Sequence, residues 1–341
     1  MNRINPLQPS SRKLLTLLFL SVTILLSTRP GLTMDLTLSA GGGYDDNPAE
    51  LRGGNGAAFA ETRLDGRQRF SLEALPSFTF ALQGFAVARC YENFSDTRQL
   101  GAELEGIWQF PETPGQLELA LNVADFHNPE VEDEDFNQLG VALRLNRDLN
   151  ARLSLGWEGS LNWEDYGPDS KNSQAPKPHP GNGKGVFDKS RQSHRPPHPE
   201  PPSRHHNQGE RHDRVIGSSV DTLFAINPFI DTGAEIFWQT RHSSLDSEKS
   251  STWGGQLKFF LHPQNNLQLE IALSAARTPY RYKLQGEKRT EKTYSSTINM
   301  NYDFNSHWSW SGGWEWFRQD SKISDDEYSR NQWYTKIDFS Y

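Results

Sequence analysis

Charged side chains of both signs alternate with uncharged ones between residues 61 and 69, where the odd positions read Glu, Arg, Asp, Arg and Arg. In an extended chain, side chains two positions apart lie on the same face, so these charges share one face of a strand. Such a face cannot meet lipid or a dry core, and it suits contact with water and dissolved ions. The residues that we predict to line an aqueous lumen, here and in later segments, are Glu61, Arg63, Asp65, Arg67, Arg69, Glu103, Glu105, Arg144, Arg152, Glu158, Glu235, Lys258, Glu270, Glu315 and Lys336.

Two interpretations of this charged face are open. Acidic residues outnumber basic ones on it, so an open lumen would be aqueous with a mild preference for cations. Alternatively, many of the charges pair across neighbouring strands as a structural network. The acidic excess has a local exception in the basic row Arg63, Arg67 and Arg69. This row could face an anionic solute or pair with the acids beside it.

Histidines gather in one polar segment, between Tyr166 and His212, together with nine prolines. Neutral imidazole is a good ligand for transition metals, but these histidines have no fixed spacing on a regular element. Proline at this density blocks both helix and sheet, so we predict an extracellular loop insertion over 166–212 and no metal site. The basic residues of the insertion could attract anionic surface polysaccharide.

Clustered oxygen ligands occur at Asp45, Asp46 and Asn47, just before Pro48. Three such side chains could hold Ca²⁺. Asp-Asn-Pro is also a favourable turn sequence, and we expect a turn here.

Hydrolytic catalysis needs a nucleophile, a histidine and a third orienting group within reach of one another. Outside the insertion the histidines are His127, His242, His262 and His307, and no motif surrounds them. We therefore predict that the chain is not an enzyme and that it has no cofactor.

The elements that carry these residues read as strands with one wet face. In the segment 100–110, apolar or small residues stand at even positions and mostly polar ones at odd positions, and the pattern recurs to the C-terminus. Connections alternate in length. Short turns are expected near 75–77, 111–115, 146–150, 227–228, 262–266 and 304–306, and longer loops at 47–56, 94–97, 127–135, 166–212, 243–250, 280–290 and 320–328.

This alternation predicts about 14 strands, with 12 to 16 open, in an all-β fold. Short turns on one side and longer loops on the other are typical of a transmembrane antiparallel up-and-down β-barrel. A secreted β-sandwich or lipocalin-like barrel is the soluble alternative, but it would not need so many alternating strands. Aromatic residues near the strand ends favour the membrane barrel, because they suit the two membrane interfaces. They include Phe110, Trp163, Trp253, Trp308 and Tyr341.

Composition agrees with a chain that has one lipid face and one water face. Of 341 residues only 35% are hydrophobic, yet 11% are aromatic, and the mean hydropathy is −0.74. A net charge of −8 argues against a nucleic-acid binder. Residues 1–33 resemble a secretory signal peptide, with basic residues before a short apolar core, and residues 34–341 form the predicted barrel. The single cysteine, Cys90, allows no intramolecular disulfide.

Two motifs carry a resemblance to known families. The C-terminal segment 333–341 ends on an aromatic residue after alternating apolar ones, and it resembles the signal read by the outer-membrane barrel assembly machinery; the signal residues are Trp333, Ile337, Phe339 and Tyr341. The first mature strand, with Tyr44-Asp-Asp-Asn-Pro48 at its end, resembles the β-barrel porin families found beside exopolysaccharide-export genes. The Pro- and His-rich insertion is a departure from that family.

We therefore predict a protein of the Gram-negative outer membrane that acts as a passive, porin-like channel for small hydrophilic solutes. A barrel component of exopolysaccharide export or cell-surface assembly is the alternative. Expected partners are outer-membrane lipid and lipopolysaccharide, the barrel assembly machinery and anionic polysaccharide, and no nucleic acid.

Overall fold

The computed structural model describes residues 34–50, 55–72, 75–111, 113–128, 135–166, 211–284, 287–321 and 327–341. Within these ranges the chain forms fourteen strands and one 3₁₀ helix, η2 (Asp246–Glu248). No helix among them is long and apolar enough to cross a membrane. The strands are β1 (Met34–Asp45), β2 (Ala57–Leu72), β3 (Leu75–Tyr91), β4 (Thr97–Gln109), β5 (Gly115–His127), β6 (Phe136–Asn150), β7 (Leu153–Tyr166), β8 (Arg211–Asn227), β9 (Ile230–Ser243), β10 (Ser250–Gln264), β11 (Leu267–Leu284), β12 (Glu287–Asp303), β13 (Trp308–Ser321) and β14 (Tyr328–Ser340).

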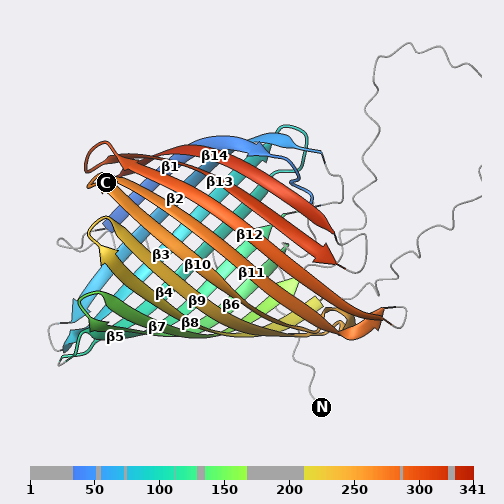
Figure 1. Cartoon of the computed structure of the whole chain (residues 1–341), viewed down its shortest axis with the longest axis horizontal. Helices are drawn as coiled ribbons and strands as arrows, with labels where there is room; N and C mark the ends of the chain where they lie inside the picture. Colours follow the sequence, from blue (N-terminus) through green and yellow to red (C-terminus); the bar gives the residue numbers. More distant parts are fainter. Residues whose placement is uncertain are drawn as a thin grey trace, which may run out of the picture.

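Every strand pairs in antiparallel fashion with its sequence neighbours, and β1 pairs with β14 to close the barrel (Figure 1). Closure gives each described strand a partner on both sides, which satisfies backbone donors and acceptors without a free edge. The predicted all-β, 14-strand, up-and-down barrel is confirmed.

Some predicted boundaries are wrong by a few residues. The turn expected at 146–150 lies instead at 151–152, because β6 continues to Asn150 through an irregularity in its pairing with β7. The turn expected at 75–77 is part of β3, and the loop expected at 280–290 is largely the ends of β11 and β12. Tyr166, Arg211 and His212, placed in the predicted insertion, belong to β7 and β8, while 167–210 and the signal predicted at 1–33 lie outside the described residues.

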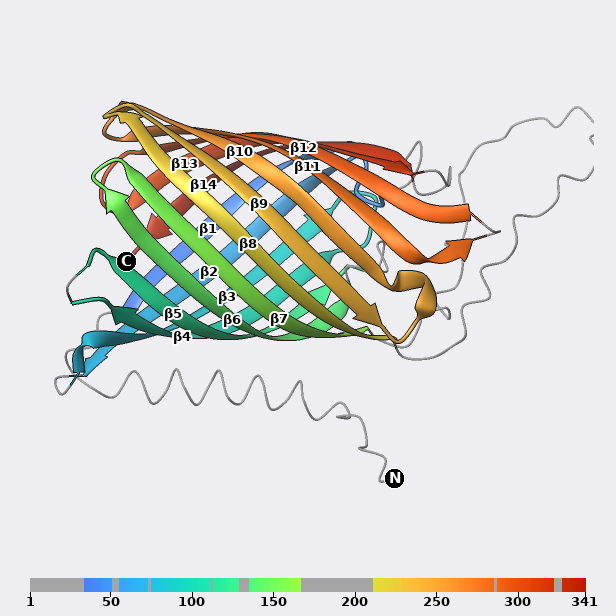
Figure 2. The ribbon, with the colours of Figure 1, turned by 60° about the horizontal axis from the view of Figure 1, so that its bottom comes forward.

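The two ends of the described chain meet at the side of the barrel where the short turns lie. The backbone of Tyr341 donates to Leu36 O at 2.9 Å and accepts from Leu36 N at 3.2 Å. Figure 2 shows the C-terminus at the same end as the turns between β6 and β7 and between β8 and β9. In outer-membrane barrels the short turns are periplasmic.

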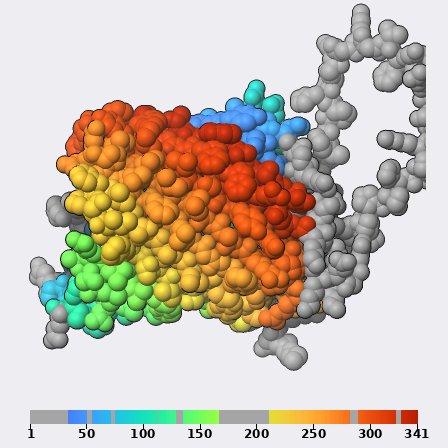
Figure 3. Space-filling model, viewed as in Figure 1, coloured from blue at the N-terminus to red at the C-terminus, as the bar shows by residue number. Residues whose placement is uncertain are grey.

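Period-two alternation divides the wall into two faces. Large apolar side chains point outward and stay exposed, as with Leu38 at 53%, Ile236 at 75% and Leu257 at 50%. Small residues on the opposite face, such as Ala120 and Ala142, are buried beneath the side chains of the interior. Figure 3 shows that the side chains of β10 to β14, orange to red, pack into a continuous outer wall. Such an apolar outer belt is what a lipid-facing barrel requires.

Aromatic residues flank the apolar belt at both ends. Trp163 and Trp253 lie toward the loop ends of their strands, while Trp308 and Tyr341 lie at the turn end. The Trp308 ring packs on Phe339 with centroids 4.9 Å apart. Tryptophan and tyrosine suit the membrane–water interface because they have an apolar ring and a polar tip.

Candidate functional site

The strand register carries the predicted lining residues to the inner face of the barrel. On β2 the odd positions face inward, because the guanidinium of Arg67 reaches past β3 to Glu105 on β4, with Nη2 2.7 Å from Oε2. Residues that lie directly opposite each other on paired strands share a face, so the register of each strand pair gives the inner positions of the other strands. Glu61, Arg63, Asp65, Arg67, Arg69, Glu103, Glu105, Arg144, Glu158, Glu235, Lys258, Glu270, Glu315 and Lys336 all lie on this face.

Arg152 is the exception among the predicted lining residues. It lies in the turn between β6 and β7, where its backbone N–H donates to Asn150 Oδ1 at 2.8 Å. Its side chain is exposed at the turn-side rim. The prediction that Arg152 lies on a strand was wrong. Strand β6 extends to Asn150, further than its apolar alternation indicates, so the turn falls on residues 151 and 152.

Arg144 gathers carboxylates from three strands in the wall from β4 to β7. Its Nη1 contacts Glu118 and lies 3.3 Å from Glu103 Oε1, while its Nε donates to Glu158 Oε2 at 2.9 Å. A carboxylate oxygen from each of Glu103, Glu105 and Glu118 lies within 4.8 Å of the others, a spacing that could hold a metal ion. Arg144 and Arg67 supply positive charge to this cluster instead.

Other predicted lining residues also pair. Arg89 holds Glu61, with Nη2 2.6 Å from Oε2, and Arg63 holds its strand neighbour Asp65 at 2.6 Å. The pairs Lys258–Glu235 and Lys336–Asp338 are looser, at 3.7 Å each. Most of the predicted charges therefore form a network across the wall, as one of the two interpretations expects.

Among the inward carboxylates that take part in no ion pair with another described residue are Asp221, Glu270 and Glu315. Asp221 and Glu315 are exposed on the inner face, so the interior of the wall meets solvent. The negative electrostatic potential of such a carboxylate extends into the lumen, because no neighbouring cation cancels it. All three lie on the half of the barrel formed by β8 to β13.

At the loop end of the inner face, charges and aromatic rings form compact clusters. Arg241 Nη1 lies 2.8 Å from the Tyr166 hydroxyl and 2.9 Å from Asp213 Oδ2, and Arg211 stacks over the Tyr166 ring. Arg89 likewise lies over the Phe59 ring, with 4.4 Å from its guanidinium carbon to the ring centroid. Such stacked, hydrogen-bonded arginines fix the shape of the barrel mouth.

The Asp45–Asn47 motif joins the first strand to the last. Arg330 on β14 donates through Nε and Nη2 to Asp45 Oδ2, at 2.9 and 2.6 Å, and the Asp46 carboxylate accepts from the backbone and side chain of Asn331. The Asn47 N–H donates to Asp45 Oδ1 at 3.0 Å, which makes the expected turn. The carboxylates considered as calcium ligands are thus engaged with β14. Sequence alone could not identify these partners, because about 285 positions separate them.

A polar recess lies in the inner wall formed by β11 to β14, with a volume of about 270 Å³. Tyr334, Asn299 and Lys336 are among its lining residues, and the Tyr334 hydroxyl donates to Asn299 Oδ1 at 2.6 Å. The other polar residues around the recess include Gln268, Glu270, Asn301, Ser311 and Asp338. The sequence signal that could have located it is the run of Asn, Gln and Ser at inward positions.

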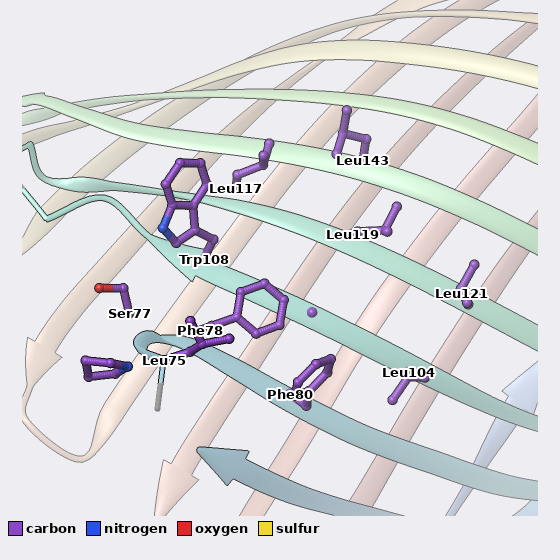
Figure 4. Close-up of a pocket in the computed structure, with 12 residues that line it drawn as sticks. Leu75, Ser77, Phe78, Phe80, Leu104, Trp108, Leu117, Leu119, Leu121 and Leu143 are labelled. Carbon is purple, nitrogen blue, oxygen red and sulfur yellow. The ribbon is translucent and has the colours of Figure 1, made fainter. Parts of the chain in front are cut away.

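A larger hollow, of about 780 Å³, lies on the outer face of β3 to β6 and is almost entirely apolar. Figure 4 shows Phe78, Phe80, Trp108 and several leucines around it. Since these side chains belong to the lipid-facing set, the hollow takes apolar groups and is not part of the lumen.

The histidines with side-chain partners among the described residues contact aspartates or a backbone carbonyl. His127 Nδ1 lies 3.3 Å from Asp135, and His262 Nε2 lies 3.2 Å from Asp231. His212 Nδ1 lies 2.7 Å from Asp165, and His307 Nδ1 lies 2.9 Å from Ser340 O.

Comparison with known proteins gives a likeness in fold. No family model and no curated protein matches this sequence. Among solved structures, the trimer form of OmpT, an outer membrane protein of Vibrio cholerae, matches at 9% identity and a TM-score of 0.52, covering 92% of this chain and 100% of that one. An anion-selective porin from Comamonas acidovorans matches at 7% identity and a TM-score of 0.48, covering 91% and 99%. The closed barrel, its apolar outer belt and the first of these likenesses identify the fold of the chain as that of a bacterial outer-membrane β-barrel.

Proposed function

We propose that this protein is a passive, porin-like channel that lets small hydrophilic solutes diffuse across the outer membrane. The observation that carries the proposal is the inner face, where charged side chains such as Asp221 and Glu315 are exposed to solvent. A small hydrophilic solute can pass along such a wall, because the polar lining replaces part of the water that the solute loses. The proposal involves no catalysis and no cofactor.

The unpaired carboxylates give this channel a preference for cations. Arg144 and Arg67 offset part of the charge of the carboxylates on β4, β5 and β7, whereas Asp221, Glu270 and Glu315 have no cationic partner among the described residues. A wall with net negative charge concentrates cations and depletes anions near it.

Conductance through planar lipid bilayers tests the proposal. The full mature chain, inserted from detergent, should give stable open channels whose reversal potential in a KCl gradient favours K⁺ over Cl⁻. Replacing these three carboxylates together, Asp221→Asn with Glu270→Gln and Glu315→Gln, should lower the K⁺ to Cl⁻ permeability ratio about two-fold while the channel stays open.

The matched control removes a paired carboxylate together with its cation on the same face, Glu235→Gln with Lys258→Gln. Because the two charges cancel, the net charge of the wall is unchanged, and the permeability ratio should stay close to that of the unaltered protein. A correctly folded, heat-modifiable protein that gives no conductance would rule out the channel and leave the barrel.

Export of exopolysaccharide is the second candidate, and its support is the resemblance of the Tyr44–Pro48 motif to barrels found beside export genes. In this role the same lumen would serve as an exit duct for a polymer. Neighbouring genes for glycosyltransferases and a polysaccharide-export lipoprotein, together with loss of surface polysaccharide on deletion, would favour export over diffusion.

A further inference from the structure

Tyr334 lies flat against the inner wall. Its side chain starts on β14 and crosses β13 to reach Asn299 on β12, where the two oxygens are 2.6 Å apart. The residue that it crosses is Gly313, and a Cβ there would lie 2.7 Å from the Tyr334 hydroxyl and 2.6 Å from Asn299 Oδ1. Glycine therefore lets the ring rest on the backbone with its other face toward the lumen.

The recess beside this ring offers donors and acceptors in mixed order. Asn299, Asn301 and Gln268 each carry an amide, which both donates and accepts. Glu270 accepts without a cationic partner among the described side chains, and it lies close enough to Tyr334 to interact with it electrostatically. Lys336, which also lines the recess, can only donate.

One acceptor in the recess is buried and unused. Asp338 Oδ1 takes no hydrogen bond from any residue that the structure describes, and the nearest ion-pair partner, Lys336 Nζ, is 3.7 Å away. A buried acceptor without a donor is costly, so a hydroxyl that reached this oxygen would be favoured.

We propose that this recess is a binding subsite for a small polyhydroxylated solute of the monosaccharide class, a proposal that rests on the channel function above. Each sugar hydroxyl both donates and accepts, which suits a lining of amides and carboxylates. The C–H groups of a sugar ring pack on the electron-rich face of an aromatic ring such as Tyr334. Lys336 offsets one of the two carboxylates of the recess, and the volume of about 270 Å³ suits a single ring.

Glucose added to single channels in planar bilayers tests this subsite. Glucose should reduce the current in a saturable manner, and a linear ethylene glycol oligomer of equal mass should reduce it without saturation. Glu270→Gln and Asp338→Asn should each raise the half-saturating glucose concentration about ten-fold, equivalent to about 1.4 kcal/mol, while the channel stays open and Glu270→Gln also lowers its preference for cations. The matched control is Asp221→Asn, an unpaired inward carboxylate on β8 outside the recess, which should leave glucose binding unchanged.

The outcomes separate this subsite from the channel function. Conductance without a saturable glucose effect, or equal weakening by Asp221→Asn, would overturn the subsite alone, as would saturation by putrescine in place of glucose. If no channel opens, equilibrium dialysis of glucose against the detergent-folded barrel decides: binding that Asp338→Asn weakens would keep the subsite, and no binding would overturn it.

Discussion

Arg144 is the residue on which the charge balance of one half of the inner wall depends. It contacts Glu103, Glu118 and Glu158 at once, and its own side chain is 30% exposed. Removing it would leave three carboxylates close together without a shared donor, and their repulsion would act across a partly desolvated surface.

We expect Arg144→Gln to destabilise the barrel by about 2 kcal/mol. The midpoint of urea unfolding in detergent, followed by tryptophan fluorescence, measures this. The matched control is Arg152→Gln, because that arginine lies exposed in the neighbouring turn, and it should change stability by at most about 0.5 kcal/mol. Equal losses in the two variants would contradict the role given to Arg144.

Single residues also mark where prediction from sequence ends. The alternation of apolar residues predicts which side chains share a face, so inward positions such as Glu105, Glu270 and Lys336 could be named in advance. It does not predict which charges pair, because partners such as Arg67 and Glu105 meet only after an intervening strand has been positioned. The unpaired acids and the recess beside Tyr334 are therefore properties of the folded wall.

At the level of elements, the seam between β1 and β14 combines backbone pairing with a polar clasp. The clasp consists of Arg330, Asp45, Asp46 and Glu50, and the Asp45 side chain is fully buried within it. A buried carboxylate depends on its donors, so loss of Arg330 would leave Asp45 with the Asn47 N–H alone among the hydrogen-bond partners named above.

Arg330→Gln should lower the temperature at which the folded barrel converts to the slower-migrating unfolded form on a gel, with a loss of about 2 kcal/mol. Arg318→Gln is the control, since that arginine on β13 is half exposed and pairs with Asp320 near the loop end. We expect no measurable shift for the control, because exposed ion pairs contribute little. An unchanged transition for Arg330→Gln would show that backbone pairing alone holds the seam.

Element boundaries were harder to predict than the elements themselves. Near Asn150 the chain continues its pairing after the apolar alternation has ended, because the Asn150 side chain accepts from the N–H groups of Arg152 and Leu153 and closes the turn. The alternation of apolar and polar residues indicates which side chains face lipid and which face the lumen. The end of a strand is set instead by its last backbone hydrogen bond.

For the whole molecule, the low mean hydropathy of the sequence follows from a wall one strand thick that has an apolar outer surface and a polar inner surface. The outward set supplies leucines and tryptophans to the membrane, and the inward set supplies charges and amides to water. No layer of the wall is a conventional hydrophobic core, so the barrel shape itself is held by backbone pairing and by the inner network.

The barrel should not need the Pro- and His-rich insertion in order to fold. Tyr166 and Arg211 are direct partners across β7 and β8, so a short Gly-Ser linker in place of residues 167–210 could join them. We expect this variant to keep its heat-modifiable migration and its unfolding temperature within a few degrees of the unaltered chain. The control inserts the same linker within β7 after Leu161, which should prevent folding; loss of the folded form in both variants would contradict the prediction.

The pairing of β1 with β14 has a consequence for biosynthesis. Thr37 and Ser340 meet across 303 positions, so the ring cannot close until the last residues have been made. Before that moment, and in any chain cut short, both terminal strands present unpaired backbone groups that can recruit other chains. Until its ring has closed, each copy of this chain therefore has to be kept apart from the others.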